Sequence, residues 1–242
     1  MLRMTLSLLK PFYLRSRYVG SRWIDRTYGI TTTDEHVARA LGWDIDHYRR
    51  TFRAMPFAGA MRLVRRLNPE PTDVLLDLGC GAGRLICVAA QYPVARIIGV
   101  ELDDGLSALA QQNARSLRRY RTQPEVVHAD ATRFHVPDEV SIVFIYNSFG
   151  GEVLRAALAR IIESFDRAPR RIRIAYANPR QHDLLMSTGR MRDAGLLRMS
   201  WRPGAEWDRT QIVRFYTVVP PASLADARKR ADGQGVAAVA SR

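Results

Sequence analysis

The strongest constraint on the fold is a glycine-rich segment at residues 74–84, which reads Val-Leu-Leu-Asp-Leu-Gly-Cys-Gly-Ala-Gly-Arg. An apolar run that ends in an acid, followed by three glycines at alternate positions and an apolar helical face, predicts a buried parallel strand turning sharply into a helix. The turn needs glycines because its backbone takes φ values that side chains resist, and because a ligand must approach the main chain closely. Amide groups at the start of the helix would then face that ligand.

Two general nucleotide-binding patterns fit this segment poorly. The dinucleotide pattern G-x-G-x-x-G needs a later third glycine, whereas Gly83 comes one residue early. The phosphate-binding loop needs Gly-Lys followed by Ser or Thr, and no lysine lies near the segment. A glycine-rich turn that binds no ligand is the remaining structural alternative.

The segment instead resembles the first motif of the class I S-adenosylmethionine-dependent methyltransferases, an acid followed by x-G-x-G-x-G, here residues 77–83. Upstream, the Asp-Arg-x-Tyr-Gly run at 25–29 and its Thr-rich continuation resemble a mostly uncharacterised bacterial subfamily. The resemblance extends from about Ile24 to Pro179. It implies an α/β fold with a doubly wound, seven-stranded, mostly parallel sheet, a helical N-terminal extension, and S-adenosyl-L-methionine as cofactor.

Acids that end the next two predicted strands point to the same site. The apolar run at 95–101 ends in Glu101, about 20 residues beyond the turn, where a doubly wound fold places the acid that accepts hydrogen bonds from ribose hydroxyls. Asp130 follows the third strand, and the resemblance implies that it contacts the adenine amino group, although an Asp there is also a common turn former. The cofactor-binding set implied by the resemblance is Asp77, Gly79, Cys80, Gly81, Gly83, Glu101, Leu102, Asp130, Ala131 and Asn147.

The fourth predicted strand, residues 140–147, is expected to end where the methyl acceptor binds. Methyltransferases acting on planar amino groups often carry Asn/Asp-Pro-Pro-aromatic at this point, and the relatives that this chain resembles tend to have Asn-Pro-Phe. Here Ser148 stands in place of the proline between Asn147 and Phe149. Asn147 and Phe149 are therefore predicted as catalytic-site residues, either holding an amino group or shaping the pocket for an oxygen nucleophile. Tyr28 and Tyr48 are candidates for a lid over cofactor and substrate, with packing as their alternative role.

The periodicity of the remaining chain predicts alternating helices and strands. Helices are expected at 35–41, 57–67, 84–91, 104–119, 152–165 and 183–192, and strands at 74–78, 95–101, 125–132, 140–147, 171–179, 196–201 and 211–219. The last two strands form an antiparallel pair. Three parts follow: a basic extension and helical lid at 1–53, the cofactor-binding domain at 54–221, and a tail at 222–242 whose Ala-, Arg- and Gly-rich composition predicts disorder.

The charge of the chain leaves several partners open. The sequence has 37 Lys and Arg against 24 Asp and Glu, a net charge of +13, which fits nucleic acid or an anionic membrane. Almost all of the basic residues are arginine, which is also typical of a GC-rich bacterial genome. The first 24 residues contain five basic residues and no acid, so residues 1–22 are a candidate for peripheral membrane contact, a targeting segment, or a plain extension.

Other residue types narrow the function. The five histidines are scattered, and no cluster at ligand spacing predicts a metal site. Cys80 and Cys87 are expected to be reduced thiols of a cytoplasmic protein. The resemblance predicts an S-adenosylmethionine-dependent methyltransferase, with a small molecule or a protein side chain favoured as acceptor. RNA is an alternative that fits the charge, and a catalytically silent relative that binds the cofactor is another.

Overall fold

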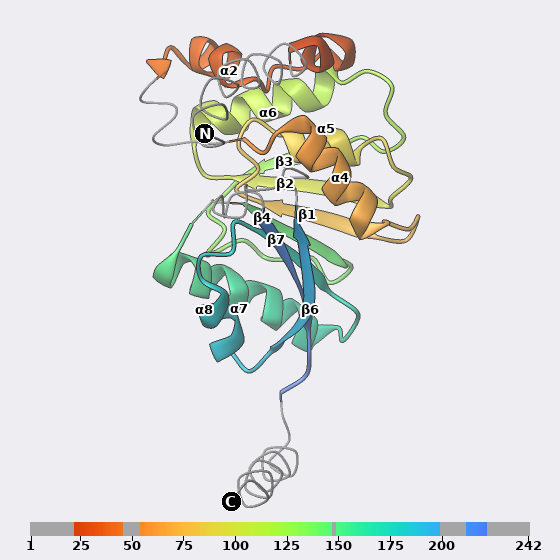
Figure 1. Cartoon of the computed structure of the whole chain (residues 1–242), viewed down its shortest axis with the longest axis vertical. Coiled ribbons are helices and arrows are strands. Elements are labelled where there is room, and N and C mark those ends of the chain that lie inside the picture. The colour runs from red at the N-terminus through yellow and green to blue at the C-terminus, as the bar shows by residue number, and fades with distance from the viewer. Residues whose placement is uncertain (1–21, 46–53, 147–148, 199–211, 222–242) are drawn as a thin grey trace, which may run out of the picture.

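A seven-stranded sheet forms the centre of the computed structural model, which describes residues 22–45, 54–146, 149–198 and 212–221 (Figure 1). The strand order is β3-β2-β1-β4-β5-β7-β6. The strands are β1 (Val74–Leu78), β2 (Arg96–Glu101), β3 (Glu125–His128), β4 (Ile142–Tyr146), β5 (Arg173–Ala177), β6 (Met191–Arg198) and β7 (Ile212–Val218). The first five are parallel, and β7 runs antiparallel to both β5 and β6. This arrangement confirms the predicted fold class.

Helices cover both faces of the sheet, which explains why the central strands are apolar throughout rather than alternating. On one face lie α4 (Phe57–Leu67), α5 (Arg84–Ala89) and α6 (Asp104–Ser116), and on the other α7 (Gly151–Arg167) and α8 (His182–Ser187). Every residue of β1 is buried. In register, Asp77 lies beside Gly99 of β2 and Phe144 of β4, so β1 stands where the sheet changes direction. Such a switch point is where doubly wound folds bind ligands.

The N-terminal extension packs outside α5 and α6 as a short helix over residues 22–28 followed by α2 (Asp34–Leu41) (Figure 1). The buried carboxylate of Asp25 holds its loop together by accepting bonds from the backbone and hydroxyl groups of Thr32 and Thr33, at 2.7–3.0 Å. Asn113 of α6 then binds the loop to the glycine turn, since its amide bonds both Thr31 and the carbonyl of Ala82. The side chains of Thr32 and Thr33 therefore bind Asp25, and Thr33, which precedes α2, makes no side-chain cap bond to that helix.

Two element boundaries near the C-terminal end differ from prediction. The helix expected to reach residue 192 ends at Ser187, because Gly189 takes a left-handed φ of 65° and stops it. Strand β6 consequently begins at Met191, five residues before its predicted start, and bulges where its register with β7 shifts near Gly195 (φ 94°). Among the described residues, no helix combines the length and apolar character that crossing a bilayer requires. The boundary at 53 and the disordered tail at 222–242 lie outside the described residues and stay predictions.

Candidate active site

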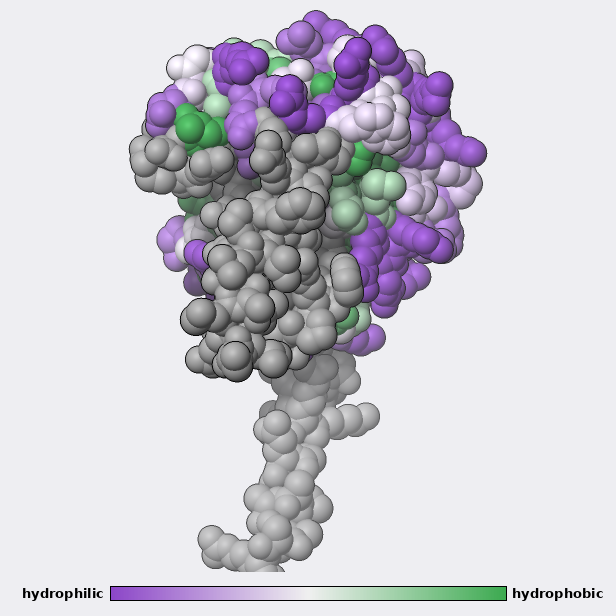
Figure 2. All heavy atoms as spheres, turned by 45° about the horizontal axis from the view of Figure 1, so that its top comes forward, coloured by the Kyte–Doolittle hydropathy of each residue, from purple (hydrophilic) through white to green (hydrophobic). Residues whose placement is uncertain are grey.

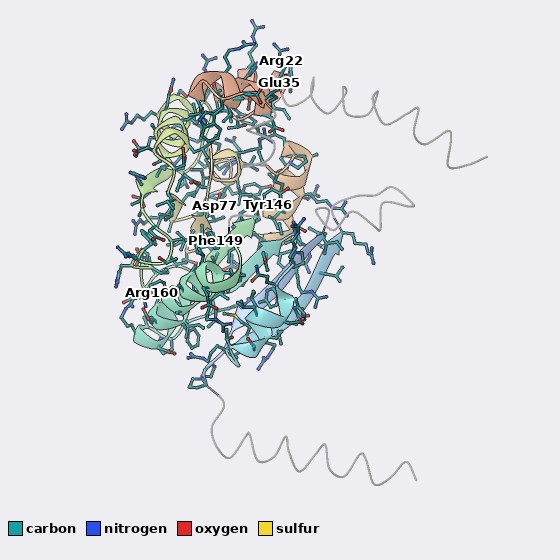
Figure 3. All side chains as sticks on the ribbon, turned by 90° about the vertical axis from the view of Figure 1, so that its left-hand side faces the viewer. Arg22, Glu35, Asp77, Tyr146, Phe149 and Arg160 are labelled. Atoms are coloured by element: carbon teal, nitrogen blue, oxygen red, sulfur yellow. The ribbon has the colours of Figure 1, made fainter. Side chains whose placement is uncertain are left out.

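A pocket of about 1070 Å³ opens at the carboxyl ends of β1, β2, β3 and β4. Its size is slightly above the range of about 300–1,000 Å³ that is typical of pockets for small ligands and cofactors. Asp77 from β1, Tyr146 from β4 and Phe149 from the following loop converge on it (Figure 3). The pocket therefore lies at the switch point where the sequence predicted a ligand.

The glycine turn lines the pocket on the β1 side through Gly79, Cys80 and Ala82, whereas Gly81 and Gly83 are not among the lining residues. Gly79, Gly81 and Gly83 have φ angles of 75°, 56° and 83°, a region that residues with a Cβ enter at a cost. Two successive amides, of Gly79 and Cys80, donate to the carbonyl of Val100 in β2 at 2.8 and 3.0 Å, which folds the turn back over the neighbouring strand. The alternate glycines are thus explained by the backbone conformation itself.

Glu101 joins the end of β2 to this turn. Its Oε2 accepts a hydrogen bond from the amide of Gly81 at 2.8 Å, and its Oε1 accepts from the amides of Leu102 and Asp103 at 2.9 and 3.0 Å. Three backbone donors hold the carboxylate at the rim of the pocket. A direct hydrogen bond therefore joins two predicted cofactor residues, Glu101 at the end of β2 and Gly81 in the turn after β1.

Asp77 is a buried carboxyl group beside that carboxylate. Its side chain is only 2% exposed and lines the pocket. Burial, and secondarily the negative charge of Glu101, raises the pKa of Asp77 well above its ordinary value. Burial likewise raises the pKa of the Cys80 thiol, so Cys80 stays protonated at neutral pH. A cationic ligand in the pocket would relieve the repulsion between the two acids.

The β3 side of the pocket carries Asp130. Its Oδ1 accepts bonds from the amide and the hydroxyl of Thr132, both at 2.8 Å, and these bonds lower the pKa of Asp130. Ala131 is buried next to it. His128, which ends β3, also lines the pocket and bonds the carbonyl of Leu102 through Nε2 at 2.8 Å. His128 was not predicted as a site residue, although its position at the end of a predicted strand was a signal in the sequence.

The β4 side is aromatic. The rings of Phe144 and Tyr146 stack with centroids 6.4 Å apart, and Phe149, Gly150 and Val153 continue this wall. Asn147 and Ser148 lie outside the described residues, so the role predicted for Asn147 stays a prediction. Phe149 lines the pocket where the sequence placed it.

The extension closes part of the pocket through residues that the sequence analysis did not select. Thr32 and Trp43 of the extension line the pocket together with Ala54 and Met55, which follow it in the chain. Tyr28 packs against the core cluster that includes α4 and α5 and is not among the lining residues. Tyr48 lies outside the described residues. The structure thus favours the packing role for Tyr28. Trp43 combines both roles, because it also packs against the cluster between α2 and α6.

Arg84, the first residue of α5, ties this cover to the glycine turn. Its side chain donates to the hydroxyl of Thr32 at 3.0 Å, to the carbonyl of Thr32, and to the carbonyl of Met55 at 2.8 Å. The guanidinium also stacks 4.7 Å from the ring centroid of Phe57. A buried arginine that bonds in this way fixes the extension over the site.

Comparison with known proteins shows which kind of domain contains this pocket. Residues 75–170 match the family model described as a methyltransferase domain. The chain therefore carries a methyltransferase domain with the fold of the class I S-adenosylmethionine-dependent methyltransferases. No curated protein matches the sequence significantly.

Solved structures agree with this fold. A TehB-like SAM-dependent methyltransferase from Corynebacterium glutamicum is 18% identical with a TM-score of 0.51, over 86% of this chain and 99% of that one. Precorrin 8w decarboxylase from Methanobacterium thermoautotrophicum is 19% identical with a TM-score of 0.51, over 71% and 95%. The magnesium protoporphyrin IX methyltransferase of Synechocystis PCC 6803, solved with bound SAM, is 19% identical with a TM-score of 0.49, over 73% and 91%.

The pocket of the methyltransferase domain fits S-adenosylmethionine, its cofactor, by the chemistry of its lining. The cofactor carries a sulfonium and an ammonium, and the acids Asp77 and Glu101 both line the pocket, where a cationic ligand would favour the ionised form of Asp77. Leu102, which is 64% exposed, offers apolar surface in the same pocket as Asp130. Among the described residues, no group of three or more His, Cys, Asp or Glu could hold a metal ion.

Proposed function

We propose that this protein transfers the methyl group of S-adenosylmethionine to a neutral or cationic acceptor, either a small molecule or a protein side chain. The observation that carries the proposal is the charge of the pocket. Its described lining contains the carboxylates of Glu101, Asp103, Asp104 and Asp130, together with the buried acid Asp77. The lining guanidinium of Arg84 is turned to the extension, where it bonds Thr32 and Met55. Such a lining attracts cations and repels phosphates.

The aromatic wall on the β4 side is the proposed acceptor subsite. Tyr146 and Phe149 offer flat apolar surface on which a planar or aliphatic acceptor can pack, next to the buried end of β1. Asn147 follows Tyr146 directly in the sequence, and we propose that its amide orients the acceptor. The fold relatives carry different names, a methyltransferase and a precorrin decarboxylase, so the acceptor must be argued from this pocket and not from the fold.

The chemistry asked of the chain is mainly orientation. S-adenosylmethionine, when bound, supplies a methyl group that is already activated for in-line displacement. The glycine turn, Glu101 and Asp130 would hold the cofactor, while Phe149 and Tyr146 would hold the acceptor's nucleophile toward it. The extension, held by the bonds of Arg84 to Thr32, would limit the access of water to the pocket.

RNA is the second candidate acceptor, supported by the net charge of +13. The carboxylates at the pocket argue against it, because a phosphate backbone entering there would meet like charge. We also propose that the protein works in the cytoplasm of a bacterial cell.

The test is a transfer assay with a labelled methyl group. The full chain and its Phe149→Ala variant are incubated with labelled S-adenosylmethionine and three acceptor pools: small amines and phenols, unstructured peptides, and total RNA. Transfer to one of the first two pools, reduced in the variant, supports the proposal. Transfer to RNA alone would replace it with the second candidate.

A further inference from the structure

One face of the molecule concentrates exposed arginines and exposed aromatic or apolar side chains. It is formed by the helix over residues 22–28, by α4, and by the segment that follows α6. Its exposed members are Arg22, Trp23, Arg26, Met61, Arg62, Arg65, Arg115, Arg118, Arg119, Tyr120 and Arg121. We call this set the arginine face.

Packing places these three segments side by side. The helix over 22–28 turns Ile24 and Tyr28 into the same core cluster as α4, α5 and Leu117, and every residue of α5 is buried. The amide of Arg118 donates to the carbonyl of Tyr28 at 2.9 Å, and the amide of Arg121 donates to the carbonyl at the end of α5 at 2.7 Å. In Figure 3 the labelled Arg22 lies at the outer surface of this layer, bordered by Glu35 of α2.

Acids are absent from the exposed part of these segments as described. Across residues 22–33, 54–67 and 105–124, the single acid is Asp25, which is buried and bonded to Thr32 and Thr33. Within the described chain, Arg26, Arg62, Arg65, Arg115, Arg118, Arg119 and Arg121 form no ion pair. Arginines elsewhere do so, as Arg167 with Asp138 at 2.7 Å and Arg214 with Asp193 at 2.6 Å. Among the described residues, exposed positive charge is therefore concentrated on the arginine face and not spread evenly over the surface.

Apolar side chains stand among these arginines. Trp23 is 68% exposed, Met61 47% and Tyr120 46%. Figure 2 shows hydrophilic residues, in purple, over the upper part of the molecule, interrupted by paler and green residues. Guanidinium groups pair with phosphates, and tryptophan and tyrosine favour the headgroup level of a bilayer.

We propose that the arginine face docks on an anionic membrane surface. Clustered arginines provide attraction to acidic lipid headgroups, and the three protruding apolar side chains provide insertion. A nucleic acid would use the arginines and the aromatic rings, but Met61 offers it no stacking surface. The chain continues from this face into residues 1–21, which contain Arg3, Lys10, Arg15 and Arg17 and no acid.

Docking at this face leaves the methyl-transfer pocket open. Helix α6 begins at the pocket with Asp104 and ends beside the arginine face at Ser116, and its 13 residues span about 20 Å. The proposal is independent of the acceptor class proposed above, since no residue of the arginine face lines the pocket.

The test is co-sedimentation of the full chain with vesicles of phosphatidylcholine alone or of phosphatidylcholine and phosphatidylglycerol, at low and high salt. The decisive variant is Arg118→Glu/Arg119→Glu/Arg121→Glu. The matched control is Arg171→Glu/Arg192→Glu/Arg198→Glu, which reverses three exposed arginines on the β5–β6 side. We expect salt-sensitive binding to the anionic vesicles, weakened on the order of 100-fold or more in the face variant and little changed in the control. Titration with S-adenosylmethionine verifies that each variant is folded.

Four results would overturn the proposal. The wild-type chain could ignore anionic vesicles, or the face variant could bind them as well as the wild type, which would assign binding to another segment. The control variant could lose as much vesicle binding as the face variant, which would attribute the effect to net charge alone. A labelled RNA could bind in place of vesicles and lose affinity in the face variant, which would make nucleic acid the partner.

Discussion

The two halves of the pocket are built in different ways. The half formed by β1, β2 and β3 is made of backbone amides, a glycine turn and carboxylates at strand ends, with Glu101 held by three amide donors. The half formed by β4 is a wall of side chains, including Tyr146, Phe149 and Val153. The first half suits a fixed cationic cofactor, and the second suits a variable acceptor. We therefore expect recognition of the cofactor to depend on backbone geometry in the first half, and recognition of the acceptor to depend on side-chain shape in the second half.

The comparison predicts its largest effect at Glu101. Glu101→Gln keeps the size of the side chain but removes the negative charge from the bonds to Gly81 and to the cofactor. Losing charge-assisted hydrogen bonds of about 1.5–3 kcal/mol should weaken S-adenosylmethionine binding roughly 10- to 100-fold, measured by isothermal titration. Binding of the product S-adenosylhomocysteine should weaken as well.

Glu125→Gln is the matched control. Glu125 is the first residue of the edge strand β3, and its side chain forms an exposed ion pair with Arg96. That variant should bind the cofactor like the wild type. Equal loss in both variants, or no loss at Glu101, would remove the carboxylate from the cofactor half of the pocket.

The acceptor half is tested by Phe149→Ala. Removing the ring shortens the aromatic wall beyond β4, while the glycine turn and its hydrogen bonds stay as they are. We expect kcat/KM for the acceptor to fall about tenfold, with cofactor affinity within about twofold of the wild type. A parallel loss of cofactor binding would show that the two halves are not separable.

The difference between the halves also explains what could be predicted from the sequence. Strand β1 and helix α4 were predicted at their observed bounds because an apolar run and a 3.6-residue period are local signals. The turn and the acids at strand ends were predictable for the same reason. The way the extension covers part of the pocket was not predictable. Arg84 contacts Thr32 and Met55, which lie 52 and 29 residues away in the sequence, and such contacts leave no periodic pattern. The extent of β6 depended on left-handed glycines that the alternation did not reveal.

A smaller effect is expected when Asp77 is changed to Asn. Because burial and the charge of Glu101 raise the pKa of Asp77 above the ordinary 3.8, the folded chain holds this proton more tightly than the unfolded chain does. Its contribution to stability is therefore complete at pH values below 3.8 and is lost as the pH rises toward the raised pKa. Asp77→Asn removes the ionisable group and with it this loss of stability at higher pH. In the absence of cofactor, the variant should therefore be more stable than the wild type at neutral pH.

The gain should appear as a higher Tm of the variant, since each kcal/mol of stability corresponds to about 2–4 °C in a chain of this size. Melting curves at pH 5 and pH 8 measure it, and the advantage of the variant should grow with pH. The cofactor should then raise the Tm of the variant less than that of the wild type, since the charge that attracts it is gone. A pH-independent difference between the two proteins would contradict the assignment of the shift to Asp77.

The smallest effect is expected at Asp130, at the outer end of the cofactor half. Its carboxylate is held by Thr132, and Asp130→Asn keeps an oxygen that can accept from both the turn and an adenine amino group. Cofactor affinity should therefore fall only about threefold, while Asp130→Ala should lose about tenfold. Because its bonds to Thr132 lower the pKa of Asp130, this group stays ionised above pH 5, and its part of the affinity should be flat from pH 6 to 9. An Asn variant as weak as the Ala variant would mean that the negative charge, and not the acceptor oxygen, is what the cofactor reads.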